Sequence, residues 1–396
     1  MTYADVNGNT KTELTYAENT TWGDFDQTYL VYATNYIEQS TPLKKNWNWI
    51  SVYVNNAILE NNINKMFSSI GANGISIKDN KNTSSYSEKY GAWMGSLENL
   101  DNASMYKVKM EIADTLVMNG VEDRETVVEI SNGWNWIPYL RSFALSLDDA
   151  LASAEPARND QIKGQEGFAM YNGTKWNGTL KAMTPGKGYL YMSKSNDDKS
   201  FNYPTQRNVA TAALAPERRN VVERTFAPVD PTEFESNMTM LAVVKDGDEI
   251  LENAQEIAVF NGAVCLASTT MENDGFFYLT IPGDKTVTSR LTIVAVIDGN
   301  IVETSTSFYF VEDAILGDFD APFAVTVGNA TTIGKMLAEG DYCRLQVIDL
   351  NGRVFYAGSV ADFDENSLND GQYIFEFFTA DGQVVCYKQL IRRIAE

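Results

Sequence analysis

The sequence comprises 396 residues, carries a formal net charge of −22 and contains no histidine. The lack of histidine excludes Ser-His-Asp and Cys-His catalysis, histidine general bases, and most zinc and non-haem iron sites, because these depend on imidazole. The acidic surface would repel phosphate backbones and anionic membranes, so we expect neither nucleic acid nor a membrane surface as a partner.

The length exceeds what one hydrophobic core usually supports, so roughly two to four domains are expected. Hydrophobic residues make up 44% of the chain and aromatic residues 12%, which is typical of a folded protein. The three cysteines show no C-x-x-C spacing, so neither a disulfide scaffold nor a zinc site is indicated. The composition predicts no cofactor.

The opening of the chain resembles a later part of the same chain. The tetrapeptide Gly-Asp-Phe-Asp at 23–26 recurs at 317–320, an offset of 294 residues. We therefore expect residues 1–38 to be the tail strands of a truncated immunoglobulin-like module, with its complete copy at 233–329. Either the chain is then an excerpt of a longer tandem protein, or its opening piece supplies strands to a neighbour.

A tryptophan motif divides the next part of the chain into two repeats. Trp-Asn-Trp-Ile occurs at 47–50 and again at 134–137, and a further tryptophan follows each copy. The two motifs are 87 residues apart, and the two further tryptophans are 83 residues apart. Six of the seven tryptophans occupy matched positions: Trp47, Trp49 and Trp93, then Trp134, Trp136 and Trp176. Self-similarity at this spacing predicts two tandem units, 39–120 and 121–203.

In the first unit, residues 47–54 are predicted to form a strand. The two tryptophans would lie on one face and the Ile/Val residues on the core-facing side. Apolar residues at helical spacing predict a helix over 59–70, which Gly71 ends.

The second unit follows the same order. Ser146 with Asp149 resembles a capping box at the start of a helix that Pro156 ends. Three short strands follow the helix in each unit. Each repeat is therefore predicted to be β-α-β-β-β.

Residues 204–232 combine several arginines and prolines, which predicts an exposed, protease-sensitive linker. Residues 233–329 then show only strand patterns, separated by turn signals such as Asn261-Gly262. The predicted strands are 238–244, 256–260, 276–281, 291–297 and 307–311. This spacing predicts an immunoglobulin-like β-sandwich.

Residues 330–396 are also predicted to be all-β. Their motif residues are Asp349, Gly352 and Arg353 in a hairpin turn, then Gly371 and Tyr373 in a strand. With these residues the segment resembles the C-terminal sorting domain of the type IX secretion system. The resemblance implies a small β-sandwich that routes the chain across the outer membrane, with the secretion and sorting machinery as partner.

Two further resemblances concern the preceding modules. The Trp-Asn-Trp-Ile units are similar to a repeat of large modular surface proteins of the same kind of bacteria, and residues 256–265 are similar to an accessory sandwich found in them. These resemblances imply a secreted or outer-membrane-attached location after export. The chain itself opens without a signal peptide, and no apolar run reaches membrane-spanning length.

The six matched tryptophans are the candidate ligand-binding residues. Two indoles on one strand face, with the third matched indole, could form a platform on which sugars stack. The same spacing is equally what packing against a helix or a second sheet would demand. A glycan or a host or cell-surface protein is therefore a candidate partner.

Acidic residues offer two further candidate sites. Asp246 with Asp248 and Asp318 with Asp320 could supply oxygen ligands to Ca²⁺, although Asx-rich turns usually serve only as turns. The carboxylate pairs 148/149 and 362/364 could act as acid and base in glycoside hydrolysis, or simply occupy a helix N-terminus and a solvated loop.

The sequence thus predicts a mainly β chain with some α structure: two tandem β-α-β-β-β repeats followed by two immunoglobulin-like β-sandwich domains. The predicted function is non-catalytic, namely adhesion or structural display in a secreted or cell-surface modular protein. One alternative is a carbohydrate-binding accessory region of a larger secreted enzyme, whose catalytic part lies upstream. Another is a carboxylate-dependent glycoside hydrolase.

Overall fold

A computed structural model describes residues 3–4, 10–11, 36–206, 224–327, 342–349, 352–364, 367–369, 371–379 and 384–391. These residues form a mainly β fold with several small antiparallel sheets. At the N-terminus, strands β1 (Tyr3–Ala4) and β2 (Thr10–Lys11) pair antiparallel. Residues 1–2, 5–9 and 12–35 of the predicted tail module, including 23–26, lie outside the described residues, and residues 36–38 instead begin the first strand of the unit that follows.

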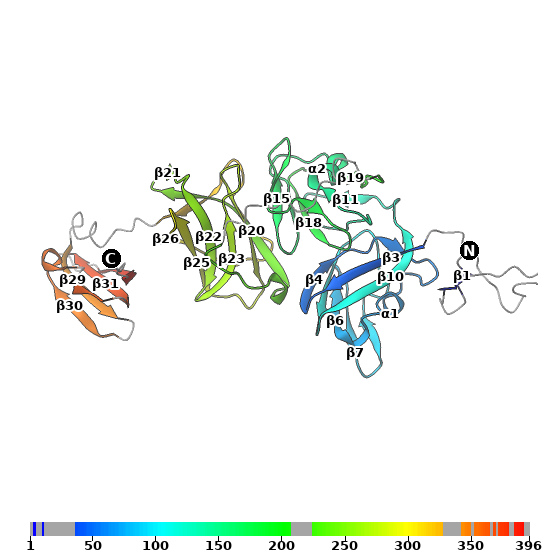
Figure 1. The fold of residues 1–396 in the computed structure, drawn as a ribbon, viewed down its shortest axis with the longest axis horizontal. Helices are drawn as coiled ribbons and strands as arrows, with labels where there is room; N and C mark the ends of the chain where they lie inside the picture. The colour runs from blue at the N-terminus through cyan, green and yellow to red at the C-terminus, as the bar shows by residue number, and fades with distance from the viewer. Residues whose placement is uncertain are drawn as a thin grey trace, which may run out of the picture.

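The first Trp unit, residues 36–122, consists of a five-stranded and a three-stranded sheet (Figure 1). The larger sheet has the order β4-β9-β6-β7-β8, and the smaller has the order β3-β10-β5. The elements are β3 (Tyr36–Leu43), β4 (Asn46–Ile50), β5 (Val54–Asn55), α1 (Ile63–Met66), η1 (Gly71–Asn73), β6 (Gly74–Lys78), β7 (Thr83–Ser87), β8 (Ala92–Gly95), β9 (Tyr106–Met110) and β10 (Asp114–Glu122).

The second Trp unit, residues 128–203, has a five-stranded sheet in the order β12-β18-β14-β15-β16 and two small strand pairs, β11-β19 and β13-β17. Counted along the chain, its large sheet has the same strand order as that of the first unit. The elements are β11 (Val128–Ile130), β12 (Gly133–Ile137), β13 (Leu145–Ser146), α2 (Leu147–Ala150), η2 (Ala152–Ala154), β14 (Gln161–Lys163), β15 (Phe168–Tyr171), β16 (Trp176–Gly178), β17 (Ala182–Met183), β18 (Tyr189–Ser193) and β19 (Lys199–Phe201).

The asparagine between the paired tryptophans has the same structural role in both units. Asn48 Oδ1 accepts the backbone N–H of Lys44 at 2.9 Å, and Asn135 Oδ1 accepts that of Ser131 at 2.9 Å. Asn48 also donates its side-chain N–H to the carbonyl of Lys44, and Asn135 donates its side-chain N–H to the carbonyl of Ser131. The asparagine therefore closes the turn that leads into the tryptophan strand.

The helices are much shorter than the sequence pattern predicts. Residues 59–70 contain only the four-residue helix α1, and α2 also has four residues. In both units the second helical residue uses its side chain to accept the backbone N–H of the third tryptophan: Asn64 from Trp93 at 2.6 Å and Asp148 from Trp176 at 3.0 Å. These polar anchors hold a single turn of helix against the sheet.

The predicted strand at 47–54 is interrupted because its middle residues bind the second unit. The backbone N–H of Ser51 donates to Gly186 O at 3.0 Å, and that of Gly188 donates to Trp49 O at 3.1 Å. The Ser51 hydroxyl accepts the N–H of Tyr139 at 2.8 Å. These bonds join the two units edge to edge.

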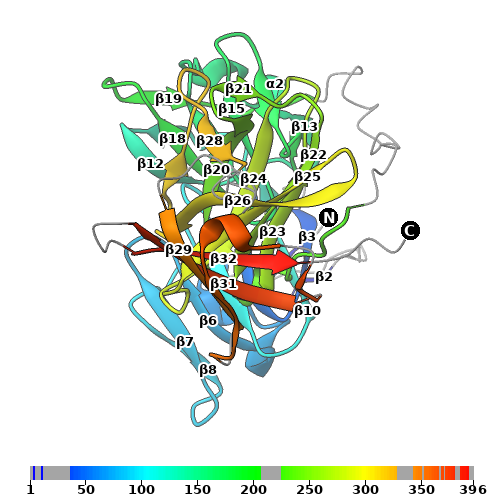
Figure 2. The ribbon, with the colours of Figure 1, turned by 90° about the vertical axis from the view of Figure 1, so that its left-hand side faces the viewer.

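The two Trp units share one hydrophobic core. A single cluster of buried side chains runs from Leu43 in the first unit to Tyr203 in the second. Figures 1 and 2 both show the units side by side, the first in blue to cyan and the second in green. Because the two units bury their side chains in one common core, the pair forms one structural body rather than two separate domains.

The sandwich module, residues 224–327, places its core between two sheets. One sheet has β20 at its centre, with β24 and β21 antiparallel to it and β27 and β28 parallel; the other has the order β23-β22-β25-β26. Its elements are η4 (Pro231–Glu233), β20 (Ser236–Asp246), β21 (Glu249–Ile250), β22 (Ala254–Asn261), β23 (Val264–Thr270), β24 (Phe277–Gly283), β25 (Arg290–Ile297), β26 (Asn300–Tyr309), β27 (Ile315–Leu316) and β28 (Phe323–Thr326).

Part of the predicted linker at 204–232 packs on this sandwich module. The backbone N–H of Val229 donates to Cys265 O at 3.0 Å, and the Phe226 ring meets Phe260 edge-on at 5.4 Å. The remainder of the linker, 207–223, lies outside the described residues.

The C-terminal sheet, within 342–391, has four strands in the order β30-β29-β31-β32 and its own buried cluster. Its elements are β29 (Tyr342–Asp349), β30 (Val354–Gly358), η5 (Val360–Asp362), β31 (Gly371–Thr379) and β32 (Val384–Ile391). Among the described residues of this segment there is one sheet, whose inner face is covered by η5 and the loop that carries Phe363 and Leu368.

The close contact between the Trp units predicts the effect of a single methyl group. A Cβ at Gly188 would lie 2.6 Å from Ile50 O and 2.8 Å from Met105 Cβ, whereas one at Gly164 would meet Tyr189 at an ordinary 3.5 Å. Gly188→Ala should lower the free energy of unfolding by about 1–3 kcal/mol through overpacking. Urea unfolding of Gly188→Ala and of the control Gly164→Ala tests this, and equal stabilities would contradict the close packing of the two units.

Candidate functional site

The outer faces of the two large sheets carry a matched set of side chains. In the first unit, Trp49 lies opposite Lys107, which in turn lies opposite Lys78. In the second unit, Trp136 lies opposite Leu190, which lies opposite Lys163. Lys78 and Lys163 therefore occupy the same sheet position, two strands away from the second tryptophan.

Lys163 is the most enclosed of these charges. Its side chain has 0% exposure, and its Nζ donates to Asp313 Oδ1 at 2.6 Å and to Asn237 O at 2.9 Å. The ammonium also lies 4.5 Å from the ring centre of Trp134 and 6.0 Å from that of Trp49. A buried charge of this kind is stable only when it is paired and hydrogen-bonded, and both conditions are met here.

Lys107, from the first unit, forms the other half of the arrangement. It lies 4.8 Å from the ring of Trp49 and 4.9 Å from that of Trp136, so it sits near one indole from each unit. Its Nζ is 3.7 Å from Glu312, the residue before Asp313. We call Lys107, Lys163, their three indoles and these two carboxylates the Lys–Trp junction, since it brings together both Trp units and the sandwich module.

Burial dominates the electrostatics of the junction. It lowers the pKa of Lys163 to about 8, with the Asp313 carboxylate acting in the opposite direction. It also lowers the pKa of Lys107, against the attraction of Asp313 and Glu312. The two ammonium groups are close enough for Lys107 to lower the pKa of Lys163 further, which makes the carboxylates of the sandwich module essential to the site.

Backbone contacts of the sandwich module reinforce the junction. Trp49 Nε1 donates to Glu235 O at 3.0 Å, and Trp134 Nε1 donates to Asp313 O at 2.9 Å. Gln165 bridges the units, because its side chain accepts the N–H of Trp49 at 3.3 Å and donates to Trp47 O at 2.8 Å. The indole N–H groups of Trp49 and Trp134 are therefore bonded within the protein.

An apolar contact extends this interface along the second unit. Phe168 and Met170 pack against Leu241 and Tyr278 of the sandwich module. Beside them, Phe319 packs edge-on against Phe276 at 5.6 Å. The second unit and the sandwich module thus meet through both a charged and an apolar region.

The structure divides the six candidate tryptophans into two groups. Trp49, Trp93 and Trp176 are buried, with exposures of 2%, 5% and 9%. Trp47, Trp134 and Trp136 are half-buried on the outer faces. The buried rings present no free face in this structure, and a platform role for the half-buried ones stays a prediction.

The third tryptophan of each unit packs within the shared core. Trp93 meets Phe67 and Tyr86 edge-on, at 5.7 and 5.6 Å between ring centres. Trp176 lies 5.4 Å from Tyr171 and 5.9 Å from Tyr191. These contacts are those of an aromatic core.

The candidate calcium ligands lie in two turns. Asp246 and Asp248 flank Gly247 in the exposed turn between β20 and β21. Asp318 Oδ1 accepts two backbone N–H groups of its own turn, while Asp320 binds Arg158 at 2.9 Å. No group of three or more potential metal ligands exists among the described residues.

Asp320 is engaged in contact with the second Trp unit. Hydrogen bonds from Arg158 and Asn159 hold the pKa of the Asp320 carboxyl below its usual value. The Gly-Asp-Phe-Asp turn at 317–320 thus adds a salt bridge and the Phe319 ring to the interface between the modules.

The sorting-like residues lie on the C-terminal sheet. Asp349 Oδ1 accepts the N–H of Arg353 at 2.9 Å, Gly352 has φ +80°, and the flanking strands β29 and β30 pair antiparallel. Gly371 begins β31, and Tyr373 is buried with its hydroxyl donating to Asn369 O at 3.0 Å. The structure therefore gives these residues local packing roles.

The helix carboxylates of the second unit also have structural partners. Asp148 accepts the N–H of Trp176, and Asp149 accepts the Ser146 hydroxyl at 2.7 Å. Asp362 ends η5, and the backbone carbonyl of Asp364 accepts the N–H of Ser367 at 3.0 Å.

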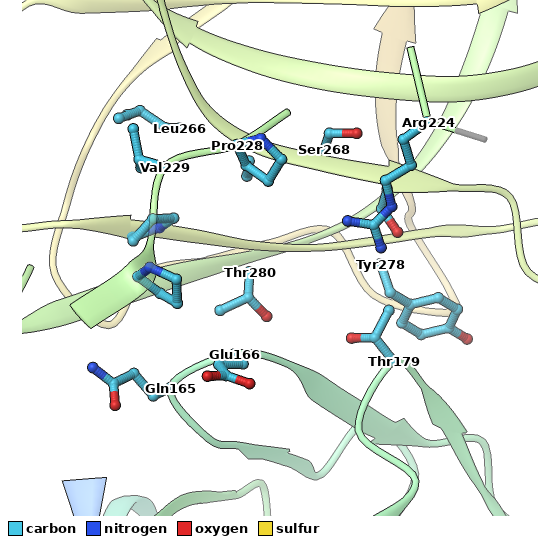
Figure 3. Close-up of a pocket in the computed structure, with 14 residues that line it drawn as sticks. Gln165, Glu166, Thr179, Arg224, Pro228, Val229, Leu266, Ser268, Tyr278 and Thr280 are labelled. Carbon is cyan, nitrogen blue, oxygen red and sulfur yellow. The ribbon is translucent and has the colours of Figure 1, made fainter. Parts of the chain in front are cut away.

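Two cavities lie between these parts of the chain. A cavity of about 250 Å³, the intermodule cavity, lies between the second unit and the sandwich module, with Arg224 and Glu166 among its lining residues (Figure 3). A smaller one of about 180 Å³ lies between the two Trp units, beside Trp49 and Tyr189.

The sequence pattern did not reveal the junction lysines. A signal was present, because Ile77-Lys78 and Ile162-Lys163 match at an offset of 85 residues. A lysine that recurs beside a buried isoleucine in both copies indicates a role for its ammonium group. Arg224, Thr280 and the other cavity residues carry no comparable signal.

The chain matches no protein-family model and no curated protein. Among the described residues, no helix combines the length and apolar character needed to cross a membrane.

The lowered pKa of Lys163 predicts a pH dependence of stability. Below about pH 8 the Lys163 amine is protonated in both the folded and the unfolded state, so folding must bury its positive charge. Between about pH 8 and 10 only the unfolded state keeps it, so the free energy of unfolding should rise with pH, by at most about 1.4 kcal/mol per unit. Lys163→Met should reduce this rise, while Lys107, whose pKa burial also lowers, keeps its own contribution.

Urea unfolding at pH 7.5, 8.5 and 9.5 provides the measurement. The matched control is Lys175→Met, which removes an exposed lysine of the same unit and should keep the pH dependence of the unchanged chain. Parallel pH profiles for the unchanged chain and Lys163→Met would show that Lys163 is not the titrating group.

The junction also predicts how tryptophan fluorescence responds to removal of the sandwich module. Fragments 36–206 and 36–327 contain the same six tryptophans, and the shared core lies within both. Acrylamide should quench 36–206 more strongly, because Trp49, Trp134 and Trp136 lose the cover of the sandwich module. Equal quenching constants, with circular dichroism showing that 36–206 is folded, would contradict the observed interface.

Proposed function

We propose that this chain is a non-catalytic segment of a secreted or cell-surface modular protein, with a role in adhesion or structural display. The observation that carries the proposal is the Lys–Trp junction. Its lysines and indoles hold two Trp units and a sandwich module in one continuous body. A surface protein that presents a binding face away from the cell needs such fixed geometry between modules.

We also propose that the two Trp units are tandem copies of one β-α-β-β-β-type module with added strands. Their common strand order supports this, as do the asparagine turn closure and the helix-to-tryptophan hydrogen bonds found in both. Gly95 and Gly178 add support: each has φ near +150° and lies where a Cβ would strike the neighbouring strand.

The same proposal extends to the remaining modules. We infer that residues 233–329 are an immunoglobulin-like sandwich, which the two sheets and their common core support. We infer that residues 330–396 act as a sorting-like domain, with the secretion machinery as partner. The hairpin at Asp349 and Arg353 and the strand that begins at Gly371 are consistent with the residues on which that resemblance depends.

Export behaviour tests the proposal directly. The full chain, placed behind a signal peptide in a bacterium with type IX secretion, should reach the cell surface and become accessible to protease added to intact cells. A chain lacking 330–396 should be retained in the periplasm, because it lacks the segment proposed to be recognised.

The control is the full chain in a strain without the secretion machinery, where it should also be retained. Surface exposure of the shortened chain, or retention of the full chain in the competent strain, would contradict the proposed role of the C-terminal segment. Each outcome is read by protease accessibility and by antibody labelling of intact cells.

A further inference from the structure

The outer faces of the two large sheets occupy equivalent positions in the two Trp units, but only one of them is covered. In the second unit, the row of side chains that crosses the outer face is Trp134, Met192, Gln161 and Met170. The sandwich module covers this row: Gln161 donates to Thr239 Oγ1 at 2.7 Å, and Met170 is only 1% exposed.

The corresponding row of the first unit is open. It consists of Trp47, Lys109, Ser76, Ser85 and Met94. Residues directly opposite each other on neighbouring strands share a face of the sheet, so these side chains lie side by side. Ser85 is exposed and Met94 is 51% exposed. We call this row the open face.

Two polar groups of the open face lack an acceptor. Lys109 Nζ lies 5.5 Å from the ring centre of Trp47, but no carboxylate of the described residues lies within ion-pair distance of it. Trp47 Nε1 makes no hydrogen bond to a described residue, whereas the equivalent Trp134 Nε1 donates to Asp313 O at 2.9 Å.

The covered face of the second unit shows which chemistry satisfies such groups. There a single acidic loop supplies both partners, because Asp313 offers its backbone carbonyl to Trp134 and its carboxylate to Lys163. The open face lacks the same two partners, a carbonyl for the indole N–H and a carboxylate for Lys109. The nearby Lys78 is already paired with a carboxylate of the sandwich module. The open face is therefore suited to an acidic turn of a protein.

The chain itself presents an acidic turn at the far end of the sandwich module. Asp246, Asp248 and Glu249 are exposed between β20 and β21, and none of the three forms an ion pair with a described residue. Strand β20 starts beside Lys163 and runs for 11 residues, which places this turn about 35 Å away. β21 and the first unit lie at opposite ends of 36–327 (Figure 1), so a contact between turn and open face joins two chains.

We propose that the open face of one chain binds the acidic turn 246–249 of a second copy. A carboxylate of the turn pairs with Lys109, and a backbone carbonyl of the turn accepts the Trp47 N–H. Ile250, which is 49% exposed beside the turn, supplies an apolar side chain for Met94. This contact goes beyond the proposed display function and does not depend on the C-terminal segment.

The contact is head-to-tail, because the two surfaces differ and lie at opposite ends of the chain. Such a contact leaves one free surface at each end and extends into an open filament unless its rotation closes a ring. The net charge of −22 opposes association, but at physiological salt the Debye length is about 8 Å, so repulsion between remote charges is screened. Exposed ion pairs are weak, and we expect assembly at chain concentrations of about 0.1–1 mM.

Charge exchange between two variants of the full chain provides the sharpest test. Lys109→Glu and Asp248→Lys each place like charges opposite each other, and each should lower the association constant by at least about fivefold. An equimolar mixture of the two variants should restore assembly, since every contact between unlike chains again joins opposite charges. Sedimentation velocity from 10 µM to about 1 mM in about 0.15 M salt provides the measurement.

Two control variants make the same changes of net charge outside both surfaces. Lys175→Glu and Asp198→Lys alter exposed residues of the second unit and should leave the association constant unchanged. The proposal is overturned if the unchanged chain stays monomeric over this range or stops at a dimer. It is also overturned if the two interface variants assemble like their controls, or if their mixture stays dissociated. The export experiment concerns the C-terminal segment alone, so the two outcomes are independent.

Discussion

An ammonium group that has no contact with water must find its counter-charge and its hydrogen-bond acceptors inside the protein. Lys163 finds them in Asp313 and in the carbonyl of Asn237, both from the sandwich module. Without that module, the second Trp unit would expose a lysine and two half-buried indoles on its outer face. The position of the sandwich module is therefore fixed by the requirement to neutralise one side chain.

A buried ion pair contributes little net stability compared with an apolar pair of the same shape, but it penalises every arrangement that separates its partners. The interface between the modules combines this penalty with the apolar contact of Phe168 and Met170 against Leu241 and Tyr278. The apolar contact supplies attraction, and the ion pair selects one geometry. The shape of the intermodule cavity therefore depends on this one geometry of the two modules.

The sequence allowed prediction of the β-rich character, the matched tryptophans and the approximate positions of the sandwich strands, since period-two patterns and Asn-Gly or Asp-Gly turns depend on local residues. The predicted helix over 59–70 was too long, because its apolar residues mostly belong to a loop that packs against the sheet. Only one turn of helix forms there, and Asn62 caps it. The outward tryptophans could not be assigned to packing or to a ligand, because that choice depends on Lys163 and Asp313, which are 150 residues apart. Likewise, Arg224 and Thr280 become neighbours of Glu166 only through docking.

The two lysines of the junction come from different Trp units, whereas their carboxylates are adjacent in the chain at Glu312 and Asp313. At the same position of the large sheet, the first unit has Lys107 and the second has Leu190. Exchanging the two units would therefore place a leucine opposite Glu312, and an ammonium group at the position of Leu190, which packs with Trp49 and Met105. The two large sheets share one strand order, yet the junction accepts the units in only one order along the chain.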